Sequence, residues 1–87
     1  MTIGAFLGGK TTLDRLCTGK QGVILQVNGS GALRRRLLDM GLTPNTRVSV
    51  RRTAPMGDPM EITLRGYELS LRKNDARMIV IIQSSGE

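Results

Sequence analysis

Residues 47–72, RVSVRRTAPMGDPMEITLRGYELSLR, contain three short runs in which apolar and polar side chains alternate. The apolar side chains of the three runs are those of Val48 and Val50, of Met60, Ile62 and Leu64, and of Tyr67, Leu69 and Leu71. A period of two with polar residues in between is typical of antiparallel strands that bury one face. Residues 54–59 link the first two runs, and Gly66 makes the tight connection to the third. The stretch therefore predicts a half-buried antiparallel sheet.

Two further strands are predicted on either side of this stretch. Residues 22–27 form a β-rich run that ends at the turn signal Asn28-Gly29. Residues 78–82 are apolar throughout, which predicts a strand that is buried on both sides. The total is five short strands.

One short amphipathic helix is predicted over residues 31–40, with Ser30 as its N-cap and Gly41 as its left-handed C-cap. Its apolar face consists of Leu33, Leu37 and Leu38. Residues 12–16 are predicted to make one helical turn, and residues 74–76 a turn or a single helical turn.

Five short strands, one small helix and tight turns within about 72 residues predict a mainly β fold, a small closed or half-closed barrel. The chain has 11 Leu, 6 Ile and 5 Val, enough for the core of one domain. We expect this domain to cover residues 12–83. Residues 1–11 and 84–87 are rich in Gly, Ser and Thr and are predicted to be flexible tails.

The composition excludes several chemistries. The 87 residues include 13 Lys and Arg against 7 Asp and Glu, which gives a net charge of +6, with no His and one Cys. Without His or a second Cys, the chain cannot form a zinc finger, a His-dependent triad or an internal disulfide. At 2% aromatic residues it lacks the stacking platforms of single-strand nucleic-acid binders. Its carboxylates show no clustering for acid–base chemistry, so the sequence predicts that the protein is not an enzyme.

The sequence shows no convincing targeting or membrane-spanning segment. The longest apolar run, residues 78–82, is far shorter than the roughly 20 residues that cross a bilayer. Near the N-terminus, residues 3–7 are interrupted by Gly4 and soon followed by Lys10, unlike the uninterrupted apolar run of a secretory signal. We therefore expect a soluble, cytoplasmic protein.

A phosphate-loop pattern, G-x-x-x-x-G-K-[ST], occurs at residues 4–11. The chemistry of this motif requires a buried strand before the loop and a helix after it. Only three residues precede Gly4, and the helical turn that follows ends by Gly19. We interpret the match as a coincidence.

The positive charge is concentrated in residues 31–53, which carry six Arg against Asp39. These arginines are Arg34, Arg35, Arg36, Arg47, Arg51 and Arg52. Three interpretations are open: contacts to nucleic-acid phosphates, a solvated face that keeps a small protein soluble, or the rim of a site for an acidic protein partner.

A metal site has little support from the residues themselves. Asp58 and Glu61 are the closest acidic residues, but they lie three apart across a turn and a strand and do not obviously face each other. Cys17 is solitary and follows Leu16, which favours a small buried hydrophobe over a ligand. Metal-ligating residues therefore stay unknown.

Three segments together resemble the ferrous iron transport protein A (FeoA) family. Residues 33–44, LRRRLLDMGLTP, resemble its R-x-L-L-x-M-G-hydrophobic-x-P-G motif, and residues 54–60, APMGDPM, its A-P-hydrophobic-G-D-P-hydrophobic loop. Residues 66–76, GYELSLRKNDA, are similar to its G-x-x-L-x-L-R-x-x-E-A segment. The likeness spans about residues 12–83, and it departs from the family pattern at Asn45, where Gly is usual, and at Asp75, where Glu is common.

The resemblance implies an SH3-like barrel and a cytoplasmic accessory of a FeoB-type ferrous iron transporter, a membrane protein with a cytosolic GTPase domain. Such an accessory would bind the transporter, support or regulate Fe(II) uptake, and lie at the inner membrane through this partner. The residues expected to contact the partner are Arg35, Arg36, Pro55, Met56, Gly57 and Asp58. The residues expected to form turns and caps are Gly41, Pro44, Asn45 and Gly66.

Two alternatives to the transporter accessory stay open. One is a nucleic-acid-binding barrel that uses residues 34–36 with Arg51 and Arg52, although no nucleic-acid partner is expected. The other is a transition-metal-binding regulatory module, since a similar domain forms part of some metal-dependent repressors. No tightly bound cofactor is expected. If the domain binds a metal, the candidate ligand is Fe(II) or another divalent transition metal. Edge strands in so small a barrel also favour weak homo-oligomers.

Overall fold

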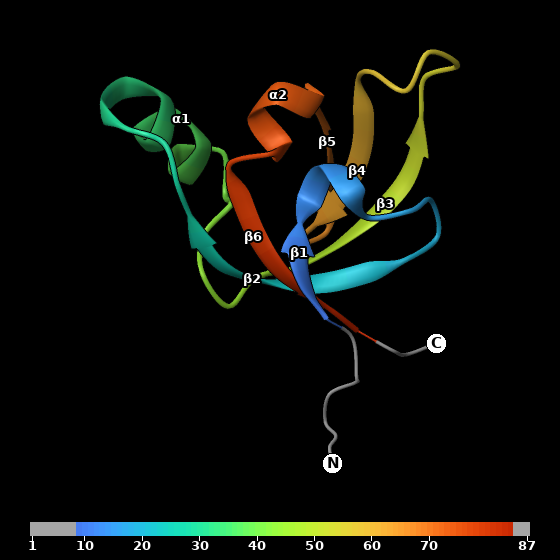
Figure 1. Cartoon of the computed structure of the whole chain (residues 1–87), viewed down its shortest axis with the longest axis horizontal. Coiled ribbons are helices and arrows are strands. Elements are labelled where there is room, and N and C mark those ends of the chain that lie inside the picture. The colour runs from blue at the N-terminus through green and yellow to red at the C-terminus, as the bar shows by residue number, and fades with distance from the viewer. Residues whose placement is uncertain (1–8, 85–87) are drawn as a thin grey trace.

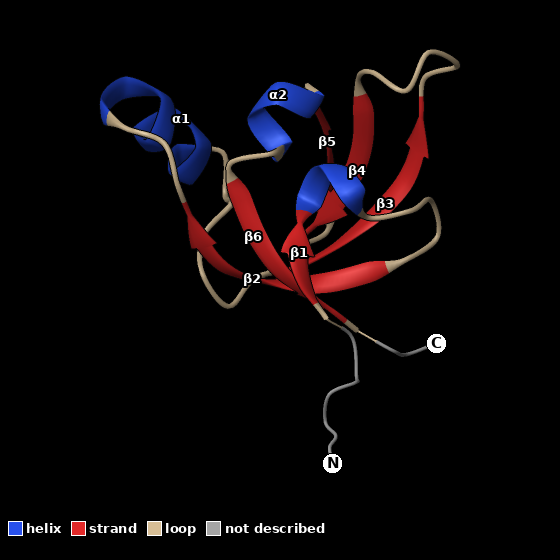
Figure 2. Cartoon of the chain, viewed as in Figure 1, coloured by secondary structure: helices blue, strands red, loops and turns tan. Residues whose placement is uncertain are grey.

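The strands of the protein form one antiparallel sheet that curls around a single core (Figures 1 and 2). The computed structural model describes residues 9–84. The elements are β1 (Lys10–Thr12), η1 (Leu13–Arg15, a 3-10 turn), β2 (Gln21–Val27), α1 (Gly31–Asp39), β3 (Arg47–Thr53), β4 (Met60–Leu64), β5 (Tyr67–Leu71), α2 (Lys73–Ala76) and β6 (Ile79–Gln83). The strand order is β1-β6-β2-β3-β4-β5. The mainly β fold with one short helix over about residues 31–40 is confirmed.

The sheet has six strands within the described residues, not the predicted five. Lys10 and Thr11, which the sequence analysis assigned to a tail, belong to β1 and pair with Ile82 and Ile81 of β6. β1 and β5 are the two edges of the sheet, and no pairing joins them in residues 9–84, so the barrel is open there. Gly9 and Ser84, also assigned to the tails, are hydrogen-bonded to Gln83 and Gln21 of the sheet. The rest of the predicted tails, residues 1–8 and 85–87, lies outside the described residues, as does most of the phosphate-loop pattern.

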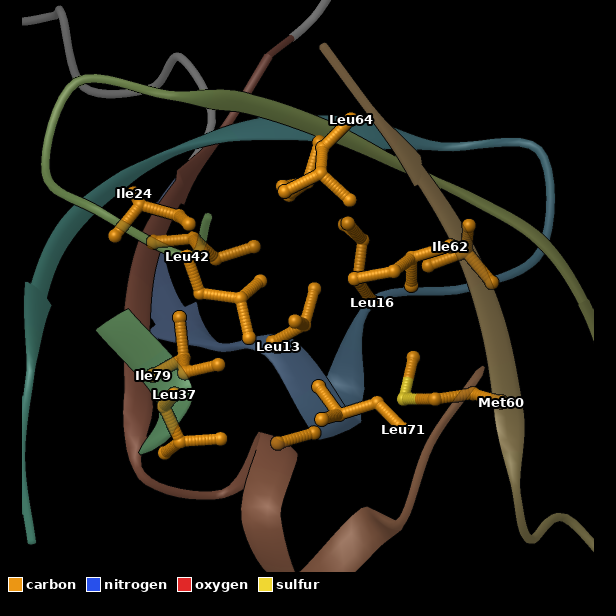
Figure 3. Close-up of a cluster of buried hydrophobic side chains, with 14 of the residues drawn as sticks. Leu13, Leu16, Ile24, Leu37, Leu42, Met60, Ile62, Leu64, Leu71 and Ile79 are labelled. Carbon is orange, nitrogen blue, oxygen red and sulfur yellow. The ribbon is translucent and has the colours of Figure 1, made fainter. Parts of the chain in front are cut away.

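The core lies on the concave side of the curled sheet (Figure 3). The inward positions of β3 and β4 are buried as the alternation predicts: Val48, Val50, Met60, Ile62 and Leu64. Helix α1 contributes Leu37, which is fully buried, while Leu33 and Leu38 are partly buried against the same cluster. These aliphatic side chains hold the sheet in its curved shape, since burying them is the main favourable contribution to folding.

The prediction that residues 78–82 are buried on both sides is wrong. Ile79 and Ile81 of β6 have no exposed surface, but Ile82 is 41% exposed. The buried and more exposed positions of β6 alternate, so only the face that carries Ile79 and Ile81 meets the core. An entirely apolar run therefore forms a strand of the ordinary half-buried kind.

The end of α1 is fixed by a close contact with β5. Gly41 follows the helix with φ of 99°, a left-handed conformation that suits glycine. The Tyr67 hydroxyl donates a hydrogen bond to the Met40 carbonyl, and a Cβ placed on Gly41 would lie 2.7 Å from that hydroxyl oxygen. Ser30 occupies the predicted N-cap position with an extended backbone, although its side chain makes no capping hydrogen bond.

Two tight turns connect the elements around β3, β4 and β5. The Thr46 N–H donates to the Thr43 carbonyl across Pro44 and Asn45, and Asn45 has φ of 72°, as a type II turn requires at that position. Gly66, with φ of 86°, lies in the connection between β4 and β5.

Within residues 9–84 neither α1 nor α2 is long and apolar enough to cross a membrane.

Candidate functional site

The loop of residues 54–59 between β3 and β4 is a closed hairpin tip. The Gly57 N–H donates to the Ala54 carbonyl at 2.7 Å, and the Ala54 N–H donates to the Pro59 carbonyl at 3.0 Å. Gly57 has φ of 88°, which a side chain would make unfavourable. These constraints hold Met56 at the tip, where its side chain is 91% exposed.

Asp58 attaches this loop to the helix α2. Its Oδ1 accepts a hydrogen bond from the Lys73 N–H at 3.0 Å, and Lys73 is the first residue of α2. The first N–H groups of a helix have no partner within the helix, so an acceptor from elsewhere satisfies one of them. Asp58 therefore fixes the position of the loop in addition to being exposed beside Met56.

The three arginines of α1 differ in the contacts that their side chains make within the protein. Arg36 Nη2 lies 3.3 Å from Asp75 Oδ2, and this ion pair joins α1 to α2. Arg34 Nε donates to the Val27 carbonyl at 3.0 Å, which ties the helix to the end of β2. Arg35 is exposed and makes no hydrogen bond or ion pair with any residue between 9 and 84, Asp39 included. Arg35 is thus the cation of α1 that is available to a partner.

Helix α2 brings the two predicted parts of the site together. It receives Asp58 from the loop at Lys73 and Arg36 from α1 at Asp75. Figure 1 shows α1, α2 and the loop on the same side of the molecule, away from the chain ends, with α2 in the middle. Sequence analysis missed this role of α2. Lys73 and Asp58 are 15 residues apart in the sequence, and Asp75 and Arg36 are 39 residues apart, so neither contact leaves a local sequence pattern.

Two of the other arginines of the basic stretch, Arg51 and Arg52, are paired with carboxylates on the sheet, whereas Arg47 Nη1 donates to the neutral Gln21 Oε1 at 3.5 Å. Arg51 Nη1 lies 3.1 Å from Glu68 Oε2, and Arg52 Nε donates to Glu61 Oε1 at 2.9 Å. The hydrogen bond that Arg52 donates to Glu61, together with the negative charge of Glu61, raises the pKa of Arg52. Arg51 and Arg52 therefore do not form a free cationic patch with residues 34–36.

A depression that the sequence did not indicate lies beside the loop. Its volume is about 550 Å³, and it opens between η1, the end of β3 and the start of α2. Its lining residues are Asp14, Arg15, Leu16, Cys17, Thr18, Thr53 and Lys73. Cys17 is exposed, so its predicted burial is wrong: Leu16 takes the inward position and the next side chain points outward.

The described part of the chain contains no group of three or more His, Cys, Asp or Glu side chains placed to hold a metal ion. Asp58 and Glu61, the closest acidic residues in the sequence, are directed to different partners, Lys73 and Arg52. No ligand set follows from these contacts.

A curled antiparallel sheet around one small core, with a protruding hairpin loop and two short helices at one end, defines a small SH3-like domain. The family model of the FeoA domain matches residues 11–83 of the chain. The chain therefore belongs to the FeoA domain family.

Relatives of known sequence and structure agree with this membership. A Fe(2+) transport protein A/Fe(2+) transporter FeoB fusion protein of Porphyromonas gingivalis is 39% identical over 69 residues, which make up 79% of this chain and only 8% of that protein. The NMR structure of a FeoA-like protein from Clostridium acetobutylicum has a TM-score of 0.82 at 32% identity and covers 91% of each chain.

A third relative supports the SH3-like fold. The crystal structure of Stenotrophomonas maltophilia FeoA complexed with zinc, described as a procaryotic SH3 domain protein, has a TM-score of 0.74 at 23% identity. It covers 85% of this chain and 95% of that chain. At this identity the likeness establishes the fold, and the predicted SH3-like architecture is confirmed.

Proposed function

We propose that the protein is a non-enzymatic accessory that binds a FeoB-type ferrous iron transporter and supports or regulates Fe(II) uptake. The observation that carries the proposal is the fusion relative, in which a FeoA sequence similar to this chain is joined covalently to FeoB. Covalent fusion keeps two domains at high effective concentration, and it is useful where the separate domains have to meet. The protein would act in the cytoplasm, held at the inner membrane by its partner.

The proposed contact surface is the side of the molecule that carries the loop and α1. Met56 and Arg35 are its contact residues, because both are exposed and Arg35 has no partner among residues 9–84. Pro55 and Gly57 shape the hairpin tip. The other predicted site residues hold the surface together from α2: Arg36 through Asp75, and Asp58 through Lys73.

Such a surface suits protein recognition. A methionine side chain adapts its shape to an apolar contact, and a loop that is already closed by hydrogen bonds loses little conformational entropy on binding. Arg35 would speed association with an acidic partner surface and set the orientation of the complex.

The nucleic-acid alternative has less support from the contacts. A phosphate-binding face needs several cations free to replace counterions. Arg34 is bound to the Val27 carbonyl, and Arg51 and Arg52 are paired with carboxylates on neighbouring strands. The transition-metal alternative and the absence of a tightly bound cofactor stay predictions.

The proposal is tested by measuring the affinity of the protein for the soluble cytosolic part of the FeoB-type transporter of the same organism. Met56→Asp and Arg35→Glu should each weaken binding by about tenfold or more, a change of roughly 1.4 kcal/mol. Leu25→Asp is the control for the first variant, because Leu25 is 38% exposed on β2. Arg47→Glu is the control for the second, because Arg47 begins β3 whereas the loop follows its end.

The controls should bind as the unmodified chain does. Equal affinity of all four variants would remove the loop and α1 from the interface. No binding by the unmodified chain at high concentration would contradict the accessory role through the cytosolic part of the transporter.

A further inference from the structure

We propose that the depression between η1, β3 and α2 receives a carboxylate side chain from an acidic segment of the protein partner. This inference rests on the proposed function and adds to it a second contact next to Met56, together with the chemistry of the partner group. The depression has a volume of about 550 Å³, which is ample for an aspartate or glutamate side chain.

Two cations line the depression and are available for an incoming anion. They are Arg15 from η1 and Lys73 from the first position of α2. Neither side chain makes an ion pair with any residue of the described range 9–84. Residue Lys73 is half-buried, whereas Arg15 is exposed.

The charge of the lining favours a single carboxylate. Asp14, the one acidic side chain in the lining, already accepts a hydrogen bond from the Thr12 hydroxyl. Two cations and one carboxylate leave a net charge of one positive unit, which matches a carboxylate better than a phosphate that carries up to two negative charges. Thr18 and Thr53, whose hydroxyl groups are neutral donors, also line the depression.

The depression adjoins the loop, so one partner segment can reach both. A Cβ placed on Gly57 would lie 3.8 Å from Lys73 Nζ, which puts the ammonium group against the loop that carries Met56. A short segment with an acidic and an apolar side chain could therefore contact Lys73 and Met56 together.

The test uses the ¹⁵N-labelled full chain and a blocked glutamate-rich peptide as the probe, with the glutamine version of the same peptide as its control. The glutamate peptide should shift the amide signals of Thr18, Thr53 and Lys73 at low salt, and the glutamine peptide should not. Lys73→Gln and Arg15→Gln should each abolish these shifts. Arg77→Gln, at the other end of α2, should leave them unchanged.

Lys73→Gln keeps the bond from Asp58, because Asp58 binds the main-chain N–H of residue 73. A loss of binding in this variant therefore reports on the ammonium group and not on the position of the loop. Equal shifts with both peptides, or shifts that survive both substitutions, would overturn the inference.

The failure of this inference differs from a failure of the proposed function. Against the cytosolic part of the transporter, Lys73→Gln should weaken binding about two- to fivefold, as expected for a partly exposed ion pair. Loss of binding in Met56→Asp with none in Lys73→Gln would leave the accessory role standing and refute the carboxylate contact. If the transporter does not bind at all, the peptide experiment still decides the inference.

Discussion

The hydrogen bond between Asp58 and α2 gives the sharpest prediction for the candidate surface. In Asp58→Ala the Lys73 N–H loses its acceptor, and the loop of residues 54–59 loses its attachment to the helix. A hydrogen bond of this kind contributes about 0.5–1.5 kcal/mol, and removing a helix-capping acceptor typically costs about 1 kcal/mol. Because Asp58 is exposed, we expect about 1 kcal/mol.

For a domain of this size, a loss of about 1 kcal/mol lowers the midpoint of thermal unfolding by roughly 4–8 °C. Thermal unfolding followed by circular dichroism measures this shift, and hydrogen exchange of the Lys73 amide reports the bond itself. Asp58→Asn is the matched control, because its side chain keeps an acceptor oxygen and should retain most of the stability. An Asp58→Ala variant with unchanged Tm and unchanged protection of the Lys73 amide would refute the reasoning.

Further predictions concern the core, the end of α1 and the surface ion pairs. Leu37→Ala should reduce the free energy of unfolding by about 2–5 kcal/mol, because Leu37 is fully buried; a loss below 1 kcal/mol in urea unfolding would show that α1 does not pack as described. Gly41→Ala should cost about 1–2 kcal/mol for its backbone conformation alone and more for the clash with Tyr67. In a Tyr67→Phe background the additional loss should disappear, and the same loss in both backgrounds would argue against the contact. Arg51→Ala should change stability by less than about 1 kcal/mol, because Arg51 and Glu68 are each 55% exposed; a clearly larger effect in thermal unfolding would mean that this pair is a structural element.

Much of the sheet could be predicted from the sequence because its signals are local. The alternation in residues 47–72 identifies β3, β4 and β5. The predicted apolar face is buried in β3 and β4, but in β5 only Leu71 is buried, while Leu69 is half-buried and Tyr67 is 45% exposed. Gly41 and Asn45 are similarly informative, because the left-handed conformations that they adopt favour these residue types.

The first strand could not be predicted in this way. β1 has only three residues, all polar, and it exists because β6 offers an edge with which it can pair. An alternation of apolar and polar residues cannot be recognised in a strand of only three polar residues. The exposure of Ile82 was missed for a related reason: an apolar run does not say how many of its faces a neighbouring layer covers.

The candidate site was predicted only in part. The motif likeness singled out the loop and α1, but it gave Arg36 and Asp58 as contact residues, and the structure shows both bound to α2. The depression with Arg15 and Lys73 is assembled from three segments distant in the sequence, so no spacing pattern reveals it. The likeness thus singled out the segments of the proposed surface, and the three-dimensional contacts show which of their residues are bound to α2.

The most direct test of the proposed accessory role is an NMR titration of the ¹⁵N-labelled protein with the soluble GTPase-containing part of the FeoB-type transporter of its own organism. The proposal predicts shifts at the amides of residues 54–59, of Arg35 and of α2, where the contacts of the surface converge. Shifts confined to the outer face of β2 and β6, around Leu25 and Ile82, would place the interface elsewhere, and no shifts at high concentration would contradict binding through this domain of the transporter.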